Sequence, residues 1–226
     1  MLAYRMSQDA FFKDKSVLII DKSDKKINDR TWCFWSQHTA EWDTVISKKW
    51  NIIRFKSAGF DAEIPLKKYT YSKIEGLDFY NQIFEQLQAS KNFQFRTETY
   101  LSHREHSVSV EVQTKNNIYS AEKLFTSILP PERLEKQTQF PVLQQHFIGW
   151  EVETPSSVFE PEIATFMDFD IPQRGNTRFM YVLPTAKNKA LVEYTLFSEK
   201  LLPKAEYEIA IQEYLEELGV TEYTIH

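Results

Sequence analysis

Residues 17–35 of this chain read VLIIDKSDKKINDRTWCFW. The first part, Val17 to Ile20, is a continuous apolar run typical of a buried parallel strand, and Asp21 follows it directly. The last part, Asn28 to Trp35, contains several aromatic residues close to an arginine and a threonine. Its apolar residues recur neither at the period of 2 residues typical of a strand nor at the period of 3.6 typical of a helix. We therefore expect a strand ending in an acid, then an aromatic loop. This order indicates a nucleotide-cofactor site open to an apolar ligand; the alternative is a loop that plugs the edge of the core.

The residues before this stretch extend the pattern. Leu2 to about Phe12 carries apolar residues at helical spacing, and Lys13 to Ser16 is a turn. Helix, turn, strand and acid form the second half of a βαβ dinucleotide-binding unit, in which Asp21 would be the ribose-binding acid. The alternative for Asp21 is a solvated strand end. The first strand of such a unit and its G-x-G-x-x-G are not in the sequence.

Bulk composition restricts the function classes. The chain has 226 residues, enough for one large domain or two small interleaved ones, and only 5 glycines. A net charge of -5 argues against nucleic acid as the main partner, because binding phosphates needs a basic surface. The single cysteine, Cys33, excludes a disulfide or a thiolate metal cluster within one chain. No metal-ligand spacing connects the histidines, which are His38, His103, His106, His146 and His226.

The next elements mix strands with one helix. We expect a loop and a short strand over 41–54, an extended segment over 62–71, and a strand over 124–129. Pro65 limits the extended segment to an edge or an end. Leu77 to Gln88 has the apolar stripe of an amphipathic helix. Alternation over 93–96 and 108–112 predicts a β-hairpin or a three-stranded meander.

The second half of the chain is richer in strands. We predict consecutive antiparallel strands over 145–153, 164–169, 177–183 and 189–197. A helix over 205–218 follows them, and Gly219 is placed to cap its C-terminus. Pro130-Pro131 marks the change between the two halves.

Taken together, these residues resemble a known family. The segment Asn28 to Trp35 is similar to the N-R-T-W-C-F-W signature of lycopene cyclases of the bacterial flavoprotein type. Further matching segments follow in the family's order: Gln145 to Trp150, Phe166 to Phe169, Arg178 to Pro184, and Ala190 to Thr195. The resemblance covers essentially the whole chain.

The resemblance implies an FAD-dependent, non-redox enzyme that closes the linear ψ-ends of lycopene into β-ionone rings. The implied fold class is α/β (α+β) of the aromatic-hydroxylase type. In this fold an incomplete Rossmann-like FAD-binding domain, here residues 1–45 and 74–135, is interleaved with an antiparallel-sheet substrate domain, residues 46–73 and 136–226. The implied cofactor is reduced FAD, with NAD(P)H as the reductant.

Two parts of the family pattern are not in this sequence. The family's G-x-G-x-x-G lies before Met1, and its second FAD segment, rich in glycine and alanine, lies beyond His226. The resemblance therefore implies a chain truncated at both ends, with the C-terminal part of the substrate domain missing. We expect this chain to bind FAD poorly or not at all.

Two acids are candidates for the catalytic chemistry. Glu193 lies in an otherwise apolar strand, where desolvation should raise its pKa toward the range that suits a general acid. The family carries a glutamate here in a Glu-Glu-Thr or Glu-Asp-Thr motif, and Tyr194 replaces the second acid. The alternative is a Glu193 that points to solvent. Asp168 is flanked by bulky apolar residues, as in a cavity lining. Its alternative is an ion pair with Arg178.

The remaining candidates concern cofactor and substrate. Asp21 and Arg30 are the predicted cofactor-binding residues; the alternative for Arg30 is a surface salt bridge. Four aromatic residues are predicted to shield a carbocation through their π faces, with core packing as the alternative for each: Trp32, Phe34, Trp35 and Trp150. Cys33 is expected to be a buried small hydrophobe.

The predicted partner is lycopene or a related carotenoid. Because lycopene is insoluble in water and the sequence has no run of about 20 apolar residues, we expect a cytoplasmic protein in peripheral contact with the inner face of the membrane. Two alternatives stay open. One is a related FAD-dependent oxidoreductase, such as a hydroxylase or prenyl reductase, which would consume a nicotinamide cofactor. The other is an inactive fragment that binds an apolar ligand.

Overall fold

The computed structural model describes residues 1–37, 41–128, 139–140 and 142–226. Contacts divide the chain into two compact units. The first comprises Met1–Cys33, Glu41–Ser47 and Lys73–Arg133, and the second comprises Phe34–Ala40, Lys48–Ser72 and Leu134–His226. The predicted assignment of one part to cofactor and the other to substrate stays a prediction.

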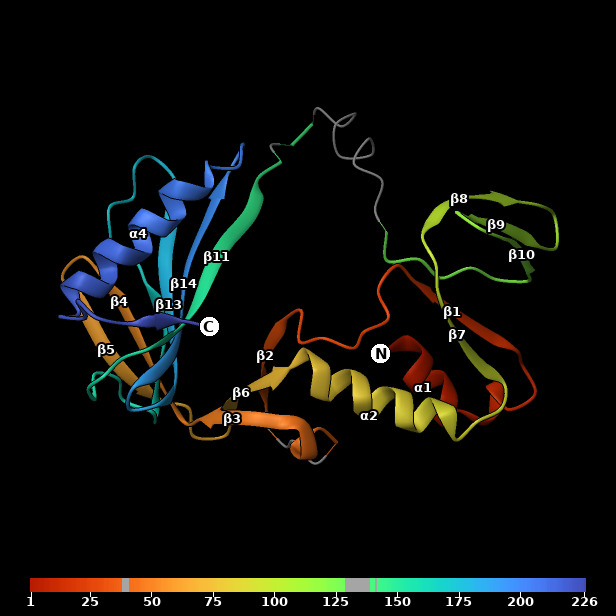
Figure 1. Ribbon diagram of the computed structural model, residues 1–226, viewed down its shortest axis with the longest axis horizontal. Coiled ribbons are helices and arrows are strands. Elements are labelled where there is room, and N and C mark those ends of the chain that lie inside the picture. The colour runs from red at the N-terminus through yellow and green to blue at the C-terminus, as the bar shows by residue number, and fades with distance from the viewer. Residues whose placement is uncertain (38–40, 129–138, 141) are drawn as a thin grey trace. The chain divides into compact units, whose positions relative to one another are not determined.

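Within its described residues, the first unit contains the helices α1 and α2 and a parallel strand pair (Figure 1). Its elements are α1 (Leu2–Gln8), η1 (Ala10–Phe12), β1 (Val17–Asp21), η2 (Asp43–Val45), α2 (Gly76–Gln88), β7 (Phe93–Thr97), β8 (Tyr100–Glu105), β9 (Val110–Thr114) and β10 (Ile118–Ala121). The predicted first helix is therefore split, because Asp9 is extended and its side chain caps the short helix η1 by accepting from the Phe11 amide.

Strand β1 is parallel, as predicted, and pairs with β7 from Val17–Phe93 to Asp21–Thr97. Its predicted burial is wrong. Ile19 packs against a small core formed by Tyr4 of α1 and Leu87 of α2, whereas Leu18 on the other face is 37% exposed. Helices thus cover only one face of β1. A continuous apolar run predicts burial on both faces, and it did not indicate that the face of Leu18 is exposed.

A three-stranded antiparallel meander is present, in the order β10-β9-β8, but the predicted run 93–96 is not part of it. That run forms β7, which pairs in parallel with β1, and β8 takes its place beside β9. The predicted strand over 124–129 is wrong for residues 124–128, which are not in a strand, and Leu129 lies outside the described residues. Phe125 and Ile128 are exposed. Apolar character alone does not make a strand where no neighbouring strand pairs with it.

A separate three-stranded sheet has the order β2-β6-β3, from strands β2 (Thr31–Ser36), β3 (Ile46–Trp50) and β6 (Thr70–Glu75). The predicted aromatic loop is therefore wrong from Thr31 onward. β-branched and aromatic residues fit a pleated surface well, so this segment forms a strand although its burial does not alternate cleanly.

The second unit is built on a seven-stranded sheet, with strand order β15-β11-β14-β13-β12-β4-β5. Its elements are β4 (Ile52–Ser57), β5 (Phe60–Pro65), β11 (Gln144–Glu153), β12 (Ile163–Asp168), β13 (Thr177–Ala186), β14 (Lys189–Ser198), α4 (Lys204–Glu217) and β15 (Thr224–Ile225). Strands β12, β13 and β14 form the predicted antiparallel run, and β11 pairs with β14. Pro65 ends the edge strand β5, as its missing amide hydrogen requires.

Helix α4 covers one face of this sheet (Figure 1). Alternate residues of β14, including Val192 and Leu196, pack against Ile211 and Leu215 of the helix in the largest buried cluster. Gly219 ends the helix with a φ of +77°. Its amide donates to the Glu216 carbonyl at 2.9 Å, and the Val220 amide donates to the Leu215 carbonyl at 2.8 Å. These bonds form a Schellman motif, which confirms the predicted cap.

Candidate active site

Glu193 lies on the face of the seven-stranded sheet opposite helix α4. Successive side chains of a strand point to opposite faces, and its neighbours Val192 and Tyr194 belong to the core cluster beneath α4. Glu193 is partly buried on the other face. The predicted acid therefore does not lie in the main core.

The two neighbouring strands leave space at this carboxyl group. Glu193 pairs with Gly149 of β11 on one side and with Tyr181 of β13 on the other. A Cβ atom at Gly149 would lie 3.5 Å from Cβ and Cγ of Glu193 and 3.1 Å from Cδ1 of Leu191. Glycine at this position thus keeps the space beside Glu193 open.

The environment of Glu193 favours a carboxyl group that carries a proton. Burial raises the pKa of Glu193 above its ordinary value. The Thr195 hydroxyl donates a hydrogen bond of 2.7 Å to Glu193 Oε1, which partly opposes that rise. An acid with a raised pKa and a single side-chain hydrogen bond is suited to giving up and regaining a proton.

A row of aromatic rings begins beside Glu193. The ring of Tyr181 lies 5.8 Å from that of Phe166, and the ring of Phe166 lies 5.2 Å from that of Trp35. Tyr71 contacts both, with centroid distances of 5.4 Å to Phe166 and 4.7 Å to Trp35. The π faces of such rings attract positive charge. This surface therefore combines one protonatable acid with groups that stabilise a cation.

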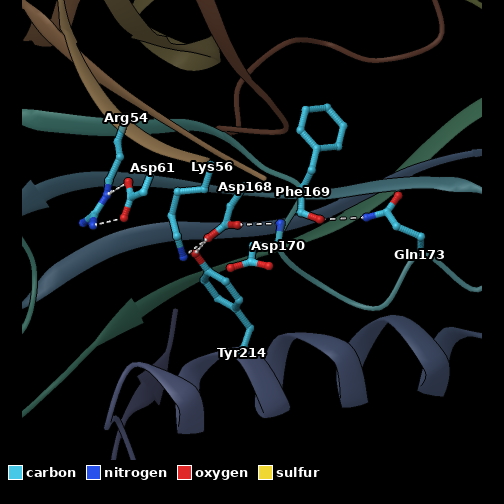
Figure 2. Close-up of polar contacts among 8 residues, drawn as sticks. All are labelled: Arg54, Lys56, Asp61, Asp168, Phe169, Asp170, Gln173 and Tyr214. Atoms are coloured by element: carbon cyan, nitrogen blue, oxygen red, sulfur yellow. Dashed lines mark hydrogen bonds and ion pairs between the residues drawn. The ribbon is translucent and has the colours of Figure 1, made fainter. Parts of the chain in front are cut away.

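Asp168 lies in a different environment (Figure 2). It is fully buried at the end of β12, and its Oδ2 atom is 2.9 Å from Lys56 Nζ. The Tyr214 hydroxyl of α4 donates to the same oxygen at 2.8 Å, and the Asp170 amide donates to Oδ1 at 2.9 Å. Burial and the neighbouring Asp168 raise the pKa of Tyr214 well above its usual value, so this tyrosine stays a donor.

The contacts of Asp168 differ from the predicted alternative. Arg178 donates instead to the Tyr194 hydroxyl at 2.9 Å, and Lys56 is the cation beside Asp168. Because Asp168 contacts α4 and Glu193 lies on the opposite face, the structure does not bring the two predicted acids together. Asp168 has the contacts of a structural acid that joins the sheet to α4.

The predicted aromatic residues of this unit separate as well. Trp35 belongs to the row beside Glu193. Trp150 follows Gly149 in β11, so it points to the other face, where it packs against the core beneath α4 and lies 6.2 Å from Tyr223. Phe34 is partly buried in β2. Core packing, the alternative weighed for each aromatic residue, describes Trp150.

In the first unit, the polar start of the signature segment binds the beginning of α2. Asn28 Oδ1 accepts from the Leu77 amide at 3.3 Å, and Asn28 Nδ2 donates to Glu75 at 2.7 Å. The Tyr80 hydroxyl donates to Asp29 at 2.7 Å. A side chain distant in sequence thus caps the helix, which satisfies one of its free amides.

Arg30 and Trp32 lie together in this unit. The guanidinium of Arg30 is 6.0 Å from the centre of the Trp32 ring and 3.5 Å from the Asp29 carboxylate, and its side chain is 55% exposed. The predicted surface ion pair is therefore present, and the exposed guanidinium still has free donors. Trp32 packs edge-on against Phe79 and Tyr80 at 5.1 and 5.7 Å.

Asp21 ends β1 at the carboxyl edge of the parallel pair. Its carboxylate accepts from the Ser23 amide at 2.8 Å and lies 3.2 Å from Lys25 Nζ. These local contacts hold the acid at the strand end and leave acceptor capacity for a further donor. Cys33 is partly buried and forms no disulfide within this chain.

Sequence reasoning missed three residues of the surface beside Glu193: Gly149, Tyr181 and Thr195. A signal existed for Gly149, since an isolated glycine within an alternating strand often marks a close approach. Alternation also places Thr195 on the same face as Glu193, two residues along the predicted strand. Tyr181 is found only once the pairing between strands is known.

Solved structures of low sequence identity share the fold. One is halogenase PltM in complex with phloroglucinol and FAD, which is 12% identical with a TM-score of 0.64; the match covers 98% of this chain and 55% of that chain. Another is a geranylgeranyl bacteriochlorophyll reductase-like protein from Thermoplasma acidophilum, which is 11% identical with a TM-score of 0.69 and is matched over 99% of this chain and 60% of that chain. A third is p-nitrophenol 4-monooxygenase PnpA from Pseudomonas putida DLL-E4, which is 12% identical with a TM-score of 0.65 and is matched over 99% of this chain and 61% of that chain. The likeness confirms the predicted fold class. The chain spans 55% to 61% of the length of these three proteins.

A comparison with curated proteins found no match. A family model, described as lycopene cyclase protein, matches residues 1–226, which is the whole sequence. The match agrees with the resemblance of the segment from Asn28 to Trp35. The chain therefore belongs to the lycopene cyclase family.

Proposed function

We propose that this protein is an FAD-dependent lycopene cyclase that converts the ψ-ends of lycopene into β-ionone rings without net oxidation or reduction. The observation that carries the proposal is Glu193, an acid with a raised pKa beside a row of aromatic rings. Membership of the lycopene cyclase family supplies the substrate class.

The chemistry follows from what these groups can do. Protonated Glu193 gives its proton to the terminal double bond of the polyene, which forms a C–H bond and leaves a carbocation. A second double bond attacks this cation and closes the ring. Removal of a ring proton, with the Glu193 carboxylate as the base, forms the ring double bond and restores the acid. Substrate and product are isomers, so atoms and electrons balance.

The aromatic row is proposed to stabilise the carbocation and to keep water away from it. A carbocation reacts quickly with water, so a productive site must stabilise the cation while excluding water. The rings of Tyr181, Phe166 and Trp35 offer negative π faces and no strong nucleophile at those faces. Their contribution is about 0.5–2 kcal/mol per cation–π contact.

The cofactor proposal rests on the first unit. Asp21 fits the ribose end of FAD, because it lies at the carboxyl end of a parallel strand with acceptor capacity to spare. The exposed guanidinium of Arg30 fits an anionic part of the cofactor. Reduced flavin, formed with NAD(P)H, would supply negative charge that stabilises a cation. The sequence has no glycine-rich phosphate loop, and weak FAD binding by this chain stays a prediction.

The proposed location follows from the substrate. A protein that takes lycopene from a bilayer needs peripheral contact with the membrane, and we propose the inner face. Among the described residues, no helix has both the length and the apolar character of a membrane span.

A second candidate is a redox flavoprotein. It is favoured by the shared fold with a geranylgeranyl bacteriochlorophyll reductase-like protein and a p-nitrophenol 4-monooxygenase. The two candidates differ in stoichiometry, because a reductase or hydroxylase consumes one nicotinamide cofactor per turnover and a cyclase does not.

The test is product analysis with the purified chain, lycopene in detergent micelles and anaerobically reduced FAD. Bound flavin is measured first, by its absorbance after gel filtration. In parallel, the same gene is expressed in lycopene-accumulating cells, and the carotenoid products of those cells are analysed. Ring-bearing products of unchanged mass, formed without stoichiometric NAD(P)H loss, support the proposal. Two results overturn it. One is a product that has gained two hydrogens or one oxygen. The other is unchanged lycopene both in cells and with reduced flavin bound to the purified chain.

A further inference from the structure

Thr195 is fully buried on the same side of β14 as Glu193, two residues along the strand. Its hydroxyl donates to Glu193 Oε1 at 2.7 Å. The register places Thr195 between Phe147 of β11 and Phe179 of β13. Threonine is stiff at χ1 because its Cβ is branched, and this packing leaves its hydroxyl little freedom.

This hydrogen bond has a consequence for the carboxyl group. A carboxylic acid carries its proton on one oxygen, while the other oxygen accepts hydrogen bonds. Because Oε1 accepts from Thr195, the proton of Glu193 is favoured on Oε2. The bond also limits rotation of the carboxyl plane, so that Oε2 keeps one orientation relative to the sheet.

We propose that Thr195 is a positioning residue that fixes the reactive proton of Glu193 on Oε2 and orients it for transfer to the substrate. This inference rests on the proposed cyclase function, and it adds a residue that acts through the acid. Thr195 would act in both proton transfers. Its hydroxyl orients the carboxylic acid that protonates the polyene, and the same hydroxyl then stabilises the carboxylate that accepts the ring proton.

Other ionisable groups lie on this face, among them Glu153 and Lys189, which form an ion pair of 2.9 Å two pairs along from Glu193. Tyr181 of β13 is the direct cross-strand neighbour of Glu193. Glu151 of β11 is exposed and lies one pair further along the same face, opposite Leu191. Helix α4 packs on the opposite face. Burial and the Thr195 bond are what set the pKa of Glu193, so removal of the bond should be visible in its titration.

The test compares Thr195→Val, which keeps the branched shape but removes the donor, with Thr195→Ser, which keeps the donor. For Thr195→Val we expect kcat to fall about tenfold, the scale of one hydrogen bond to a charged group, with KM little changed. The loss of activity at high pH should move to higher pH, because the carboxylate has lost a stabilising bond. Thr195→Ser should stay within about threefold of the parent chain with its pH profile unchanged.

Two outcomes would overturn the proposal. One is a Thr195→Val variant with the parent pH profile. The other is a Thr195→Ser variant as impaired as Thr195→Val, which would indicate a packing role alone. Thermal unfolding of both variants checks that they fold.

A substrate-free readout separates this proposal from the proposed function. The carboxyl carbon of Glu193 is titrated by NMR in ¹³C-glutamate-labelled protein, with Glu193→Gln to identify the signal. A higher pKa in Thr195→Val than in Thr195→Ser supports the positioning bond even if lycopene is not converted. Equal pKa values in the two variants contradict it even if lycopene is cyclised.

Discussion

The two faces of the seven-stranded sheet hold two acids in different environments. On the α4 face, Asp168 is fully buried and is surrounded by Lys56 Nζ, the Tyr214 hydroxyl and the Asp170 amide. On the other face, Glu193 has a raised pKa and accepts from Thr195 through one oxygen. The first acid contacts a cation and two hydrogen-bond donors. The second is largely removed from water, and no ion pair links it to another of the described residues.

Burial alone therefore does not determine the protonation behaviour of a carboxyl group. The charge of a buried carboxyl group that contacts a cation and donors is compensated, and removing the carboxyl group leaves its buried partners without an acceptor. A desolvated carboxyl group without a counter-ion is costly to ionise and therefore holds its proton.

The largest effect is expected for Glu193→Gln on activity. Glutamine keeps the shape of the side chain but cannot donate a proton as an acid, and a general acid contributes roughly 10²–10⁴-fold to a rate. Lycopene conversion, followed by chromatography, should fall by at least about 100-fold. Glu151→Gln, at an exposed position of β11, is the matched control and should retain activity. Equal rates for Glu193→Gln and the parent chain would remove Glu193 from the mechanism.

The next effect concerns stability. Asp168→Ala leaves Lys56 and Tyr214 without their acceptor, and breaking a buried pair in this way costs about 3–5 kcal/mol. Lys56 is partly exposed, so we expect the free energy of unfolding in urea to fall by about 3 kcal/mol. Asp61→Ala removes the neighbouring surface pair with Arg54 (Figure 2) and should cost much less, because water screens an exposed ion pair. Similar losses for both variants would contradict the structural role of Asp168.

Gly149 tests the space beside Glu193. Gly149→Val places methyl groups against Leu191 and Glu193, where a Cβ alone would lie 3.1 and 3.5 Å from their atoms. Overpacking of this kind costs about 1–3 kcal/mol, and we expect lycopene conversion to fall about tenfold or more. Gly149→Ala, which adds one methyl group, should show a smaller loss. A Gly149→Val variant with full activity would show that substrate does not use this space.

The smallest effect is the pH dependence of stability at Glu193. Because the folded-state pKa is raised by burial, the neutral carboxyl supports folding below the unfolded-state pKa, and this contribution is lost as pH rises through the folded-state value. Glu193→Gln should therefore match the parent chain near pH 4 and exceed its stability at pH 7. Urea unfolding at several pH values measures this difference. A variant that is less stable than the parent at pH 7 would mean that the carboxylate is stabilised after all.

Much of the fold could be predicted from local patterns. The strands β11 to β14, helix α4 and the cap at Gly219 follow from alternation, helical spacing and one glycine with positive φ. The strand β2 was mistaken for a loop, because its burial does not alternate and its strand form depends on pairing within a sheet. This pairing depends on strands that lie far from β2 in the sequence, so a local pattern does not predict it.

The orientation of the two acids could not be predicted from the sequence. Strand β14 carries apolar residues on both faces, so alternation alone left the side of Glu193 undecided, and only the packing of α4 determines it. In β12 the register shifts between Thr165 and Asp168. Such an irregularity lets Phe166 contact Tyr181 on one face while Asp168 contacts Tyr214 on the other.

The most direct test of the contrast between the two acids is the titration of the Glu193 carboxyl carbon by NMR in the parent chain, with Glu193→Gln to identify the signal. The structure predicts a midpoint above the ordinary glutamate value of about 4.3, because burial disfavours the charged form. A midpoint at or below that value would show that Glu193 is as readily ionised as a surface glutamate. It would contradict its proposed role as the proton donor.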